Sequence, residues 1–121
     1  MKVPRRPRAL VVDDDPHVRK SVVRLLEGAG VRVVEAGLPR DAFAAFLQAG
    51  PFDLLVLDVR MPQMTGPELA DALSDPGQDQ RVLFLSGELE PPRLRAGRRF
   101  LPKPFTPDEL LAEVRALVGS R

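Results

Sequence analysis

The stretch Asp53–Gly66, DLLVLDVRMPQMTG, decides how the rest of the chain is arranged. Its apolar run Leu54–Leu57 is too short to span a membrane, and an unbroken run of this kind is typical of a parallel strand covered on both faces. Asp58 follows at the carboxyl end of that strand, the edge of an open parallel sheet where ligand sites form. Proline and glycine then turn the chain toward a helix. Taken alone, Asp58 is either a reactive carboxylate or a turn cap.

A second stretch repeats this arrangement near the start of the chain. The apolar run Ala9–Val12 predicts another buried strand, and three consecutive acids, Asp13–Asp15, follow it directly. Pro16 suits the first position of a helix, and apolar residues recur from there at helical spacing until Gly28. Because parallel strands end at a common edge, both strands bring carboxylates to the same place.

The remaining chain continues to alternate strands with helices. Apolar runs predict strands over 31–34, 81–85 and 100–101, and helical spacing predicts helices over 42–47, 69–73 and 110–118, the last preceded by the capping box Thr106–Glu109. Five strands and their crossovers predict a doubly wound α/β parallel sheet. Pro91 and Pro92 interrupt the segment before the fifth strand, so we expect helix four to be shortened to one turn or missing.

Composition limits the class of protein. The chain has 121 residues, enough for one domain with a core, and no cysteine, which excludes disulfides and thiolate metal sites. No apolar segment reaches the length of a transmembrane helix or a signal peptide, so we expect a cytoplasmic protein without membrane contact. A net charge of +1 argues against direct nucleic-acid binding. Residues 1–7 form a basic tail.

The side chains that converge at the sheet edge suit phosphoryl chemistry. Carboxylates placed together repel one another, and a hard divalent cation such as Mg²⁺ relieves that repulsion through oxygen ligands. Ser86 and Lys103 end the fourth and fifth strands, where a hydroxyl and an ammonium can contact phosphoryl oxygens.

Four motifs in this order resemble the receiver domains of two-component response regulators, as found in chemotaxis regulators. They are Val12–Pro16, Asp58–Pro62 with Gly66, Ser86–Gly87 and Lys103–Phe105. The resemblance covers residues 8–119, and it implies a flavodoxin-like sheet with strand order 2-1-3-4-5.

The resemblance also implies residue roles. Asp58 would be the phosphoacceptor, and Mg²⁺ would be held by Asp13, Asp14, Asp58 and the main-chain carbonyl of Arg60. Ser86 and Lys103 would contact the phosphoryl group, and Phe100 would change rotamer as Ser86 moves. Arg60 and Glu88 would tune the lifetime of the acyl phosphate, and the Lys103–Pro104 bond would be cis.

By the same resemblance, the partner would be a sensor histidine kinase or a histidine phosphotransfer protein. The domain would be a signalling phosphoacceptor, not an enzyme, that supports its own phosphorylation and a slow autodephosphorylation. Its switched surface would act on a downstream protein that the sequence does not identify. A homodimer is compatible with the family, although an altered helix four puts the usual mode of dimerisation in doubt.

Other interpretations remain open. The chain is either a phosphorylated receiver or a receiver-like docking module that does not turn over phosphate. Asp13-x-Asp15 also resembles the haloacid dehalogenase motif, although the chain is short for that phosphohydrolase class. Asp15 is a third ligand or, as we favour, a helix cap, and His17 is expected to be exposed. The arginines at 93, 95, 98 and 99 form either an acidic-partner surface or a solvated loop.

Overall fold

The computed structural model describes residues 5–74, 80–87 and 94–119. Within these ranges the chain alternates strands and helices. In chain order they are β1 (Arg8–Val12), α1 (Pro16–Gly28), β2 (Arg32–Ala36), α2 (Pro39–Ala49), β3 (Leu54–Asp58), α3 (Gly66–Ala72), β4 (Val82–Ser86), β5 (Arg98–Pro102) and α4 (Pro107–Val118). No helix in these ranges is long and apolar enough to cross a membrane.

The five strands form one parallel sheet in the order β2-β1-β3-β4-β5, which is the flavodoxin-like arrangement predicted from the sequence. The three central strands are the unbroken apolar runs, and nearly all their residues are buried. Parallel sheets need cover on both faces, because their crossover helices pack there. The order also places β1 and β3 side by side, so the strands that end in acids are neighbours.

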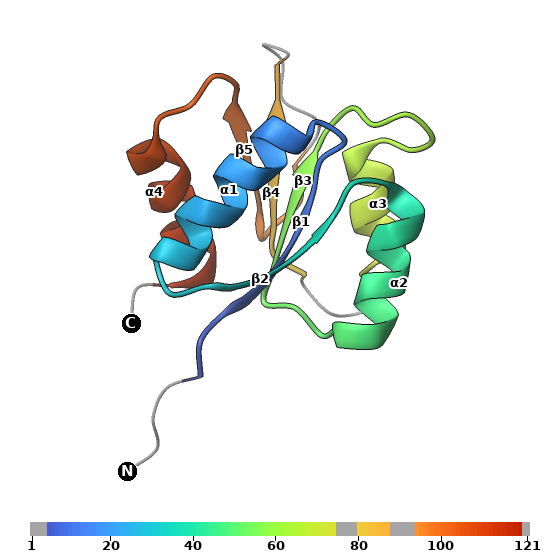
Figure 1. The fold of residues 1–121 in the computed structure, drawn as a ribbon, viewed down its shortest axis with the longest axis horizontal. Coiled ribbons are helices and arrows are strands. Elements are labelled where there is room, and N and C mark those ends of the chain that lie inside the picture. The colour runs from blue at the N-terminus through green and yellow to red at the C-terminus, as the bar shows by residue number, and fades with distance from the viewer. Residues whose placement is uncertain (1–4, 75–79, 88–93, 120–121) are drawn as a thin grey trace.

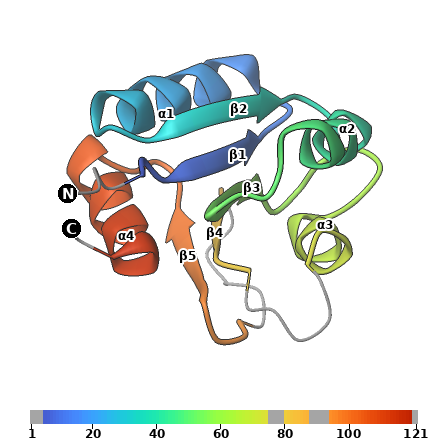
Figure 2. The ribbon, with the colours of Figure 1, turned by 90° about the horizontal axis from the view of Figure 1, so that it is seen from below.

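Helices cover both faces of the sheet, giving three layers (Figures 1 and 2). Alternate residues of each strand point to opposite faces, so the sheet contributes to two separate cores. Helices α1 and α4 pack on one core through residues such as Leu26 and Leu110. Helices α2 and α3 pack on the other through Ala42 and Leu69.

The helices begin at residues that the sequence marks. The Asp15 carboxylate accepts hydrogen bonds from the backbone N–H groups of His17 and Val18, so it caps α1 as predicted. The capping box formed by Thr106 and Glu109 begins α4, also as predicted.

All five strands differ from their predicted ranges, β1 and β3 by one residue each, because Arg8 begins β1 and Asp58 ends β3. β2 is Arg32–Ala36 instead of 31–34, β4 is Val82–Ser86 instead of 81–85, and β5 is Arg98–Pro102 instead of 100–101. β5 is longer because each of its residues pairs with one of β4, including two arginines that a pattern of apolar residues does not detect. Arg98 pairs with Asp71, and Arg99 pairs with Glu113.

The connection between β4 and β5 lacks a helix in its described part. Residues 94–97 lead through a turn into β5, which agrees with the expected shortening or loss of helix four. Pro91, Pro92 and Arg93 lie outside the described residues. Asp71 at the end of α3 accepts ion pairs from Arg95 and Arg98, at 2.7 and 2.9 Å, and so ties this connection to the neighbouring helix.

Candidate functional site

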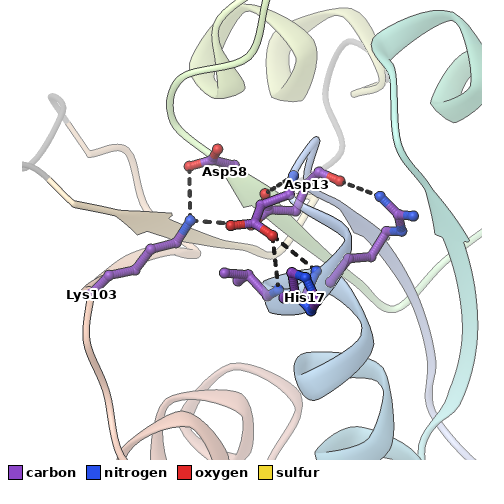
Figure 3. A network of polar contacts seen from close by, with 7 residues as sticks. Asp13, His17, Asp58 and Lys103 are labelled. Atoms are coloured by element: carbon purple, nitrogen blue, oxygen red, sulfur yellow. Dashed lines mark hydrogen bonds and ion pairs between the residues drawn. The ribbon is translucent and has the colours of Figure 1, made fainter.

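The candidate site lies at the carboxyl edge of the sheet, where the strands bring together four polar side chains. Asp58 and Ser86 are the last residues of β3 and β4, while Asp13 and Lys103 directly follow β1 and β5. The register aligns these ends, because Val12 pairs with Leu57, Asp58 with Leu85, and Ser86 with Pro102. Figure 3 shows Asp13, Asp58 and Lys103 converging there.

Three carboxylates form the acidic part of the site. Asp13, Asp14 and Asp58 each offer an oxygen, and these oxygens lie within 4.8 Å of one another. Asp13 is 1% exposed and Asp58 is 8% exposed, whereas Asp14 is open to solvent. The cluster contains only oxygen ligands and one solvent-facing acid, a donor set suited to a hard cation that keeps several waters, such as Mg²⁺.

Lys103 provides the positive charge of the site. Its Nζ lies 3.2 Å from Asp13 Oδ2 and 3.5 Å from Asp58 Oδ1, and its side chain is 22% exposed. The Lys103–Pro104 peptide bond is cis, as is Gly50–Pro51. One ammonium therefore bridges the two buried carboxylates.

The environment of Asp58 raises the pKa of its carboxyl group. Burial, and then the Asp13 carboxylate, raise the pKa of Asp58 from 3.8 to about 6, while Lys103 opposes this rise. At pH 7 the group is therefore mostly a carboxylate, but one that is poorly solvated. A desolvated carboxylate beside a cation is a suitable nucleophile for an electrophilic phosphorus.

Gly66 lies where the loop after β3 returns close to the backbone of Asp58 and Val59. Its N–H donates to the Val59 carbonyl at 2.8 Å, and a Cβ at this position would collide with the carbonyl oxygen of Asp58. The glycine of the Asp58–Gly66 motif is thus required by the close approach of two backbone segments.

The residues expected to respond to a phosphoryl group lie on the adjacent strands. Ser86 is 2% exposed, and its carbonyl accepts from the Lys103 backbone N–H at 2.7 Å. Phe100 is half-buried, pairs with Phe84 in the sheet register, and packs against the core formed with α2 and α3.

Arg60, two residues after Asp58, is exposed. Glu88 lies outside the described residues, so its pairing with Arg60 remains a prediction.

One acid and one histidine, Asp15 and His17, are near the site but do not belong to the acidic cluster. Asp15 uses its carboxylate to cap α1, and its backbone N–H donates to Asp13 Oδ1 at 2.9 Å. Asp15 is accordingly absent from the acidic cluster of Asp13, Asp14 and Asp58. His17 is exposed, as expected, in the first turn of α1.

Sequence reasoning did not identify Arg19 and Glu35 as neighbours of the site. The Arg19 guanidinium donates to the main-chain carbonyl of Asp13 at 2.8 Å and to the Glu35 carboxylate at 2.9 Å. The only sequence signal is an arginine one turn after the Asp15 cap, and such a residue on a helix is usually solvated.

A cavity of about 720 Å³ lies at the other end of the sheet and is not this site. It is lined by Arg5, Arg6, Arg81 and Arg115 together with apolar residues of α4 and the carboxyl ends of α1 and α4. Arg115 lies in the last turn of α4 and Arg81 donates to the Leu117 carbonyl of the same helix, so these two arginines offset the negative end of its dipole.

Comparisons with known proteins agree with this geometry. The family model of the response regulator receiver domain matches residues 9–115. The transcriptional regulatory protein FixJ of Azorhizobium caulinodans is 38% identical over 117 residues, which cover 90% of this chain and 54% of FixJ. The response regulator MprA of Mycolicibacterium vanbaalenii is 40% identical over 116 residues, covering 92% of this chain and 50% of MprA. This chain thus spans about half the length of these relatives.

Solved structures give the same result. The chemotaxis response regulator CheY4 of Vibrio cholerae superposes with a TM-score of 0.81 at 32% identity, covering 93% of this chain and 99% of that one. The receiver domain of the hybrid histidine kinase CckA superposes with a TM-score of 0.78 at 35% identity, covering 92% and 98% of the two chains.

Proposed function

Because this chain belongs to the response regulator receiver domain family, we propose that Asp58 accepts a phosphoryl group in a Mg²⁺-dependent reaction. The donor is a phosphohistidine on a sensor histidine kinase or a histidine phosphotransfer protein. The observation that carries this proposal is the position of Asp58 at the end of β3, between the Asp13 carboxylate and the Lys103 ammonium. The domain is a phosphoacceptor in signalling and not an enzyme that acts on other substrates.

In the proposed step, an Asp58 carboxylate oxygen attacks the phosphorus of the phosphohistidine. A P–O bond to Asp58 forms while the P–N bond breaks, and the imidazole nitrogen leaves with the bonding electron pair. Because the raised pKa of Asp58 is still below 7, the attacking group is already ionised at neutral pH. No general base is needed to remove a proton from it.

The other residues of the site would stabilise the charge that the phosphoryl group brings. Lys103 is near enough to contact a phosphoryl oxygen once Asp58 is modified, and Ser86 ends the neighbouring strand. Asp13, Asp14, Asp58 and the Arg60 carbonyl would hold Mg²⁺, which when bound supplies positive charge to the transferring oxygens. These contacts replace water in a partly buried site, where they are stronger than in solvent.

The consequence of phosphorylation would be a change in packing around β4 and β5. An acyl phosphate adds about two negative charges at neutral pH, which draws the Ser86 hydroxyl toward it. Phe100, half-buried on the adjacent strand, would then move into the space that Ser86 vacates. Arg60 and Glu88 would influence how quickly water removes the phosphoryl group.

The changed surface would act on a downstream protein or on a further domain. FixJ is a transcriptional regulatory protein, and this chain matches about half of it. No structural feature of the described residues selects a particular target. A homodimer through the β4 and β5 region would have to form without the usual helix in residues 94–97.

The test is an intact-mass comparison of the wild type and Asp58→Asn after incubation with a small acyl phosphate, with and without Mg²⁺. We expect one added phosphoryl group only on the wild type and only with Mg²⁺. Asp41→Asn, which removes an exposed acid on α2, is the matched control and should be modified normally. An unmodified wild type, beside a modified control receiver, would support the docking module instead. Modification that is lost in Asp13→Asn but kept in Asp58→Asn would support the phosphohydrolase reading.

A further inference from the structure

We propose that Arg19 is a positioning residue for the Mg²⁺ site, and that it acts by fixing the peptide that carries Asp13. This inference rests on the proposed function, because it assumes that Asp13 and Asp14 bind the cation. Arg19 lies on α1 and does not belong to the acidic cluster. Its effect would be transmitted through the backbone of the loop that follows β1.

Arg19 connects three parts of the fold through one guanidinium group. Its Nη1 donates to the Asp13 carbonyl at 2.8 Å, and its Nε donates to Glu35 Oε1 at 2.9 Å. The Arg19 side chain is only 17% exposed, whereas that of Glu35 is 38% exposed. Helix α1, the end of β1 and the end of β2 are therefore held in one arrangement.

The hydrogen bond from Arg19 to the Asp13 carbonyl lies directly beyond the last backbone pair of β1 and β2. Val12 pairs with Ala36 as the last partners of β1 and β2, and the Asp13 N–H still donates to the Ala36 carbonyl at 3.3 Å. The next group along the chain, the Asp13 carbonyl, accepts from Arg19. A side chain thus holds the strand end that carries the ligand.

Arg19 also completes the contacts around Asp13. Asp13 Oδ1 accepts from the Asp15 backbone N–H at 2.9 Å, and Oδ2 lies 3.2 Å from Lys103 Nζ. With the Arg19 contact, all four polar atoms of this buried residue are engaged. Groups that orient a ligand of a metal are commonly worth a tenfold to hundredfold change in metal affinity.

The space for the guanidinium is provided by Gly37. A Cβ at this position would lie 3.1 Å from Arg19 Nη1, and the three nearest atoms all belong to the same guanidinium. The guanidinium therefore occupies the space that a side chain at position 37 would need. Any larger residue at 37 would have to displace Arg19 by a few tenths of an ångström.

Lysine cannot reproduce this arrangement. The guanidinium donates in two fixed directions at once, toward a carbonyl and toward a carboxylate, whereas an ammonium on a flexible chain is a single point charge. Because Glu35 neutralises Arg19, the main effect of the pair on the acids is to fix their position and not to add charge. Retaining the charge in Arg19→Lys should consequently restore Mg²⁺ binding only in part.

The test is calorimetric titration of the unphosphorylated protein with MgCl₂, below the unfolding temperature. We expect Arg19→Gln to weaken Mg²⁺ binding about tenfold, and Arg19→Lys to fall between that variant and the wild type. The matched control is Arg24→Gln, on the exposed side of the same helix, which should bind as the wild type does. Urea unfolding without Mg²⁺ shows whether the variants remain folded.

A second perturbation keeps the test decisive if Arg19→Gln unfolds. The single substitution Gly37→Ala, with Arg19 retained, should weaken Mg²⁺ binding modestly, because the new methyl group displaces Arg19. If folded Arg19→Gln binds Mg²⁺ as tightly as the wild type does, the inference is wrong and the proposed function is unaffected. If Arg19→Gln does not fold, unchanged Mg²⁺ affinity in Gly37→Ala would lead to the same conclusion. Absence of Mg²⁺ binding by the wild type, or binding that survives loss of Asp13 and Asp14, would instead overturn both.

Discussion

The backbone N–H of Lys103 donates to the carbonyl oxygen of Ser86 at 2.7 Å. This hydrogen bond extends the β4–β5 ladder one residue beyond the Ser86–Pro102 pair. The sheet therefore fixes the relative backbone positions of the two residues whose hydroxyl and ammonium are proposed to contact the phosphoryl group. A shift of the Ser86 backbone would therefore also shift the Lys103 backbone.

Removing the ammonium should change both the titration and the reactivity of Asp58. Lys103 lowers the pKa of Asp58, so in Lys103→Met that pKa should rise above about 6. Loss of a positive group at the transferring oxygens should also slow phosphorylation by about a hundredfold. Carboxyl NMR titration and the mass assay measure the two effects. Lys20→Met, an exposed lysine on α1, is the control, and an unchanged Asp58 titration in Lys103→Met would contradict the prediction.

Asp58→Asn should stabilise the cation-free protein at neutral pH. The folded protein binds the Asp58 proton more tightly than the unfolded chain does, because the pKa is about 6 in one and 3.8 in the other. The wild type therefore loses stability as pH rises through this interval, by at most about 3 kcal/mol. Asparagine has no such charge to bury.

Urea unfolding at about pH 4.5 and about pH 7.5 measures this difference. The stability gap between Asp58→Asn and the wild type should be larger at the higher pH, and adding Mg²⁺ should reduce it. Glu27→Gln removes an exposed acid of α1 and should show no comparable increase. A gap that stays constant with pH would show that the Asp58 carboxylate is not strained by burial.

Asp14 and Asp15 should respond in opposite ways to substitution. Asp15 caps α1, so Asp15→Ala should cost about 1 kcal/mol of stability and leave Mg²⁺ affinity nearly unchanged. Asp14 is exposed and belongs to the acidic cluster, so Asp14→Asn should weaken Mg²⁺ binding without destabilising the protein. Urea unfolding and MgCl₂ titration of both variants separate the two roles. Strong loss of Mg²⁺ binding in Asp15→Ala would make Asp15 a ligand after all.

Asp71 should matter more to stability than its half-exposed position indicates. It pairs with Arg98, whose side chain is 6% exposed, and with Arg95, whose side chain is 65% exposed. Asp71→Asn should cost about 1–3 kcal/mol, less than a fully buried pair because Asp71 is itself half exposed. Arg95→Gln should cost less than about 1 kcal/mol. Equal losses for the two variants in urea unfolding would show that the burial of Arg98 is unimportant.

The sheet and the meeting of its polar strand ends could be predicted because the central strands are unbroken apolar runs. Such runs identify buried parallel strands, and the residue after each run then falls at a common edge. Asp13, Asp58 and Lys103 do lie together there. The chemical roles of these residues remain proposals, but their proximity follows from strand order alone.

Other features depend on contacts that a linear pattern does not contain. β5 extends over Arg98 and Arg99, which pair with β4 in the sheet and whose side chains contact acids from α3 and α4. Arg19 resembles any solvated helix residue until α1 is packed against β2 and Glu35 comes within reach. In both cases the deciding partner lies on another element, and its distance is set by packing.

Lys103 and Asp13 are 90 residues apart in the chain, and they belong to an edge position and a central position of the sheet. A strand at the edge of a sheet pairs with a single neighbour, so local unfolding can detach it while the other strands stay paired. A molecule whose β5 has detached would keep most of its core and the acids of the site. It would lose the Lys103 ammonium and the hydrogen bond between the Lys103 N–H and the Ser86 carbonyl. Efficient phosphorylation of Asp58 would therefore require that the whole chain has folded. Partly folded molecules would react much more slowly, because they lack the Lys103 ammonium at the site.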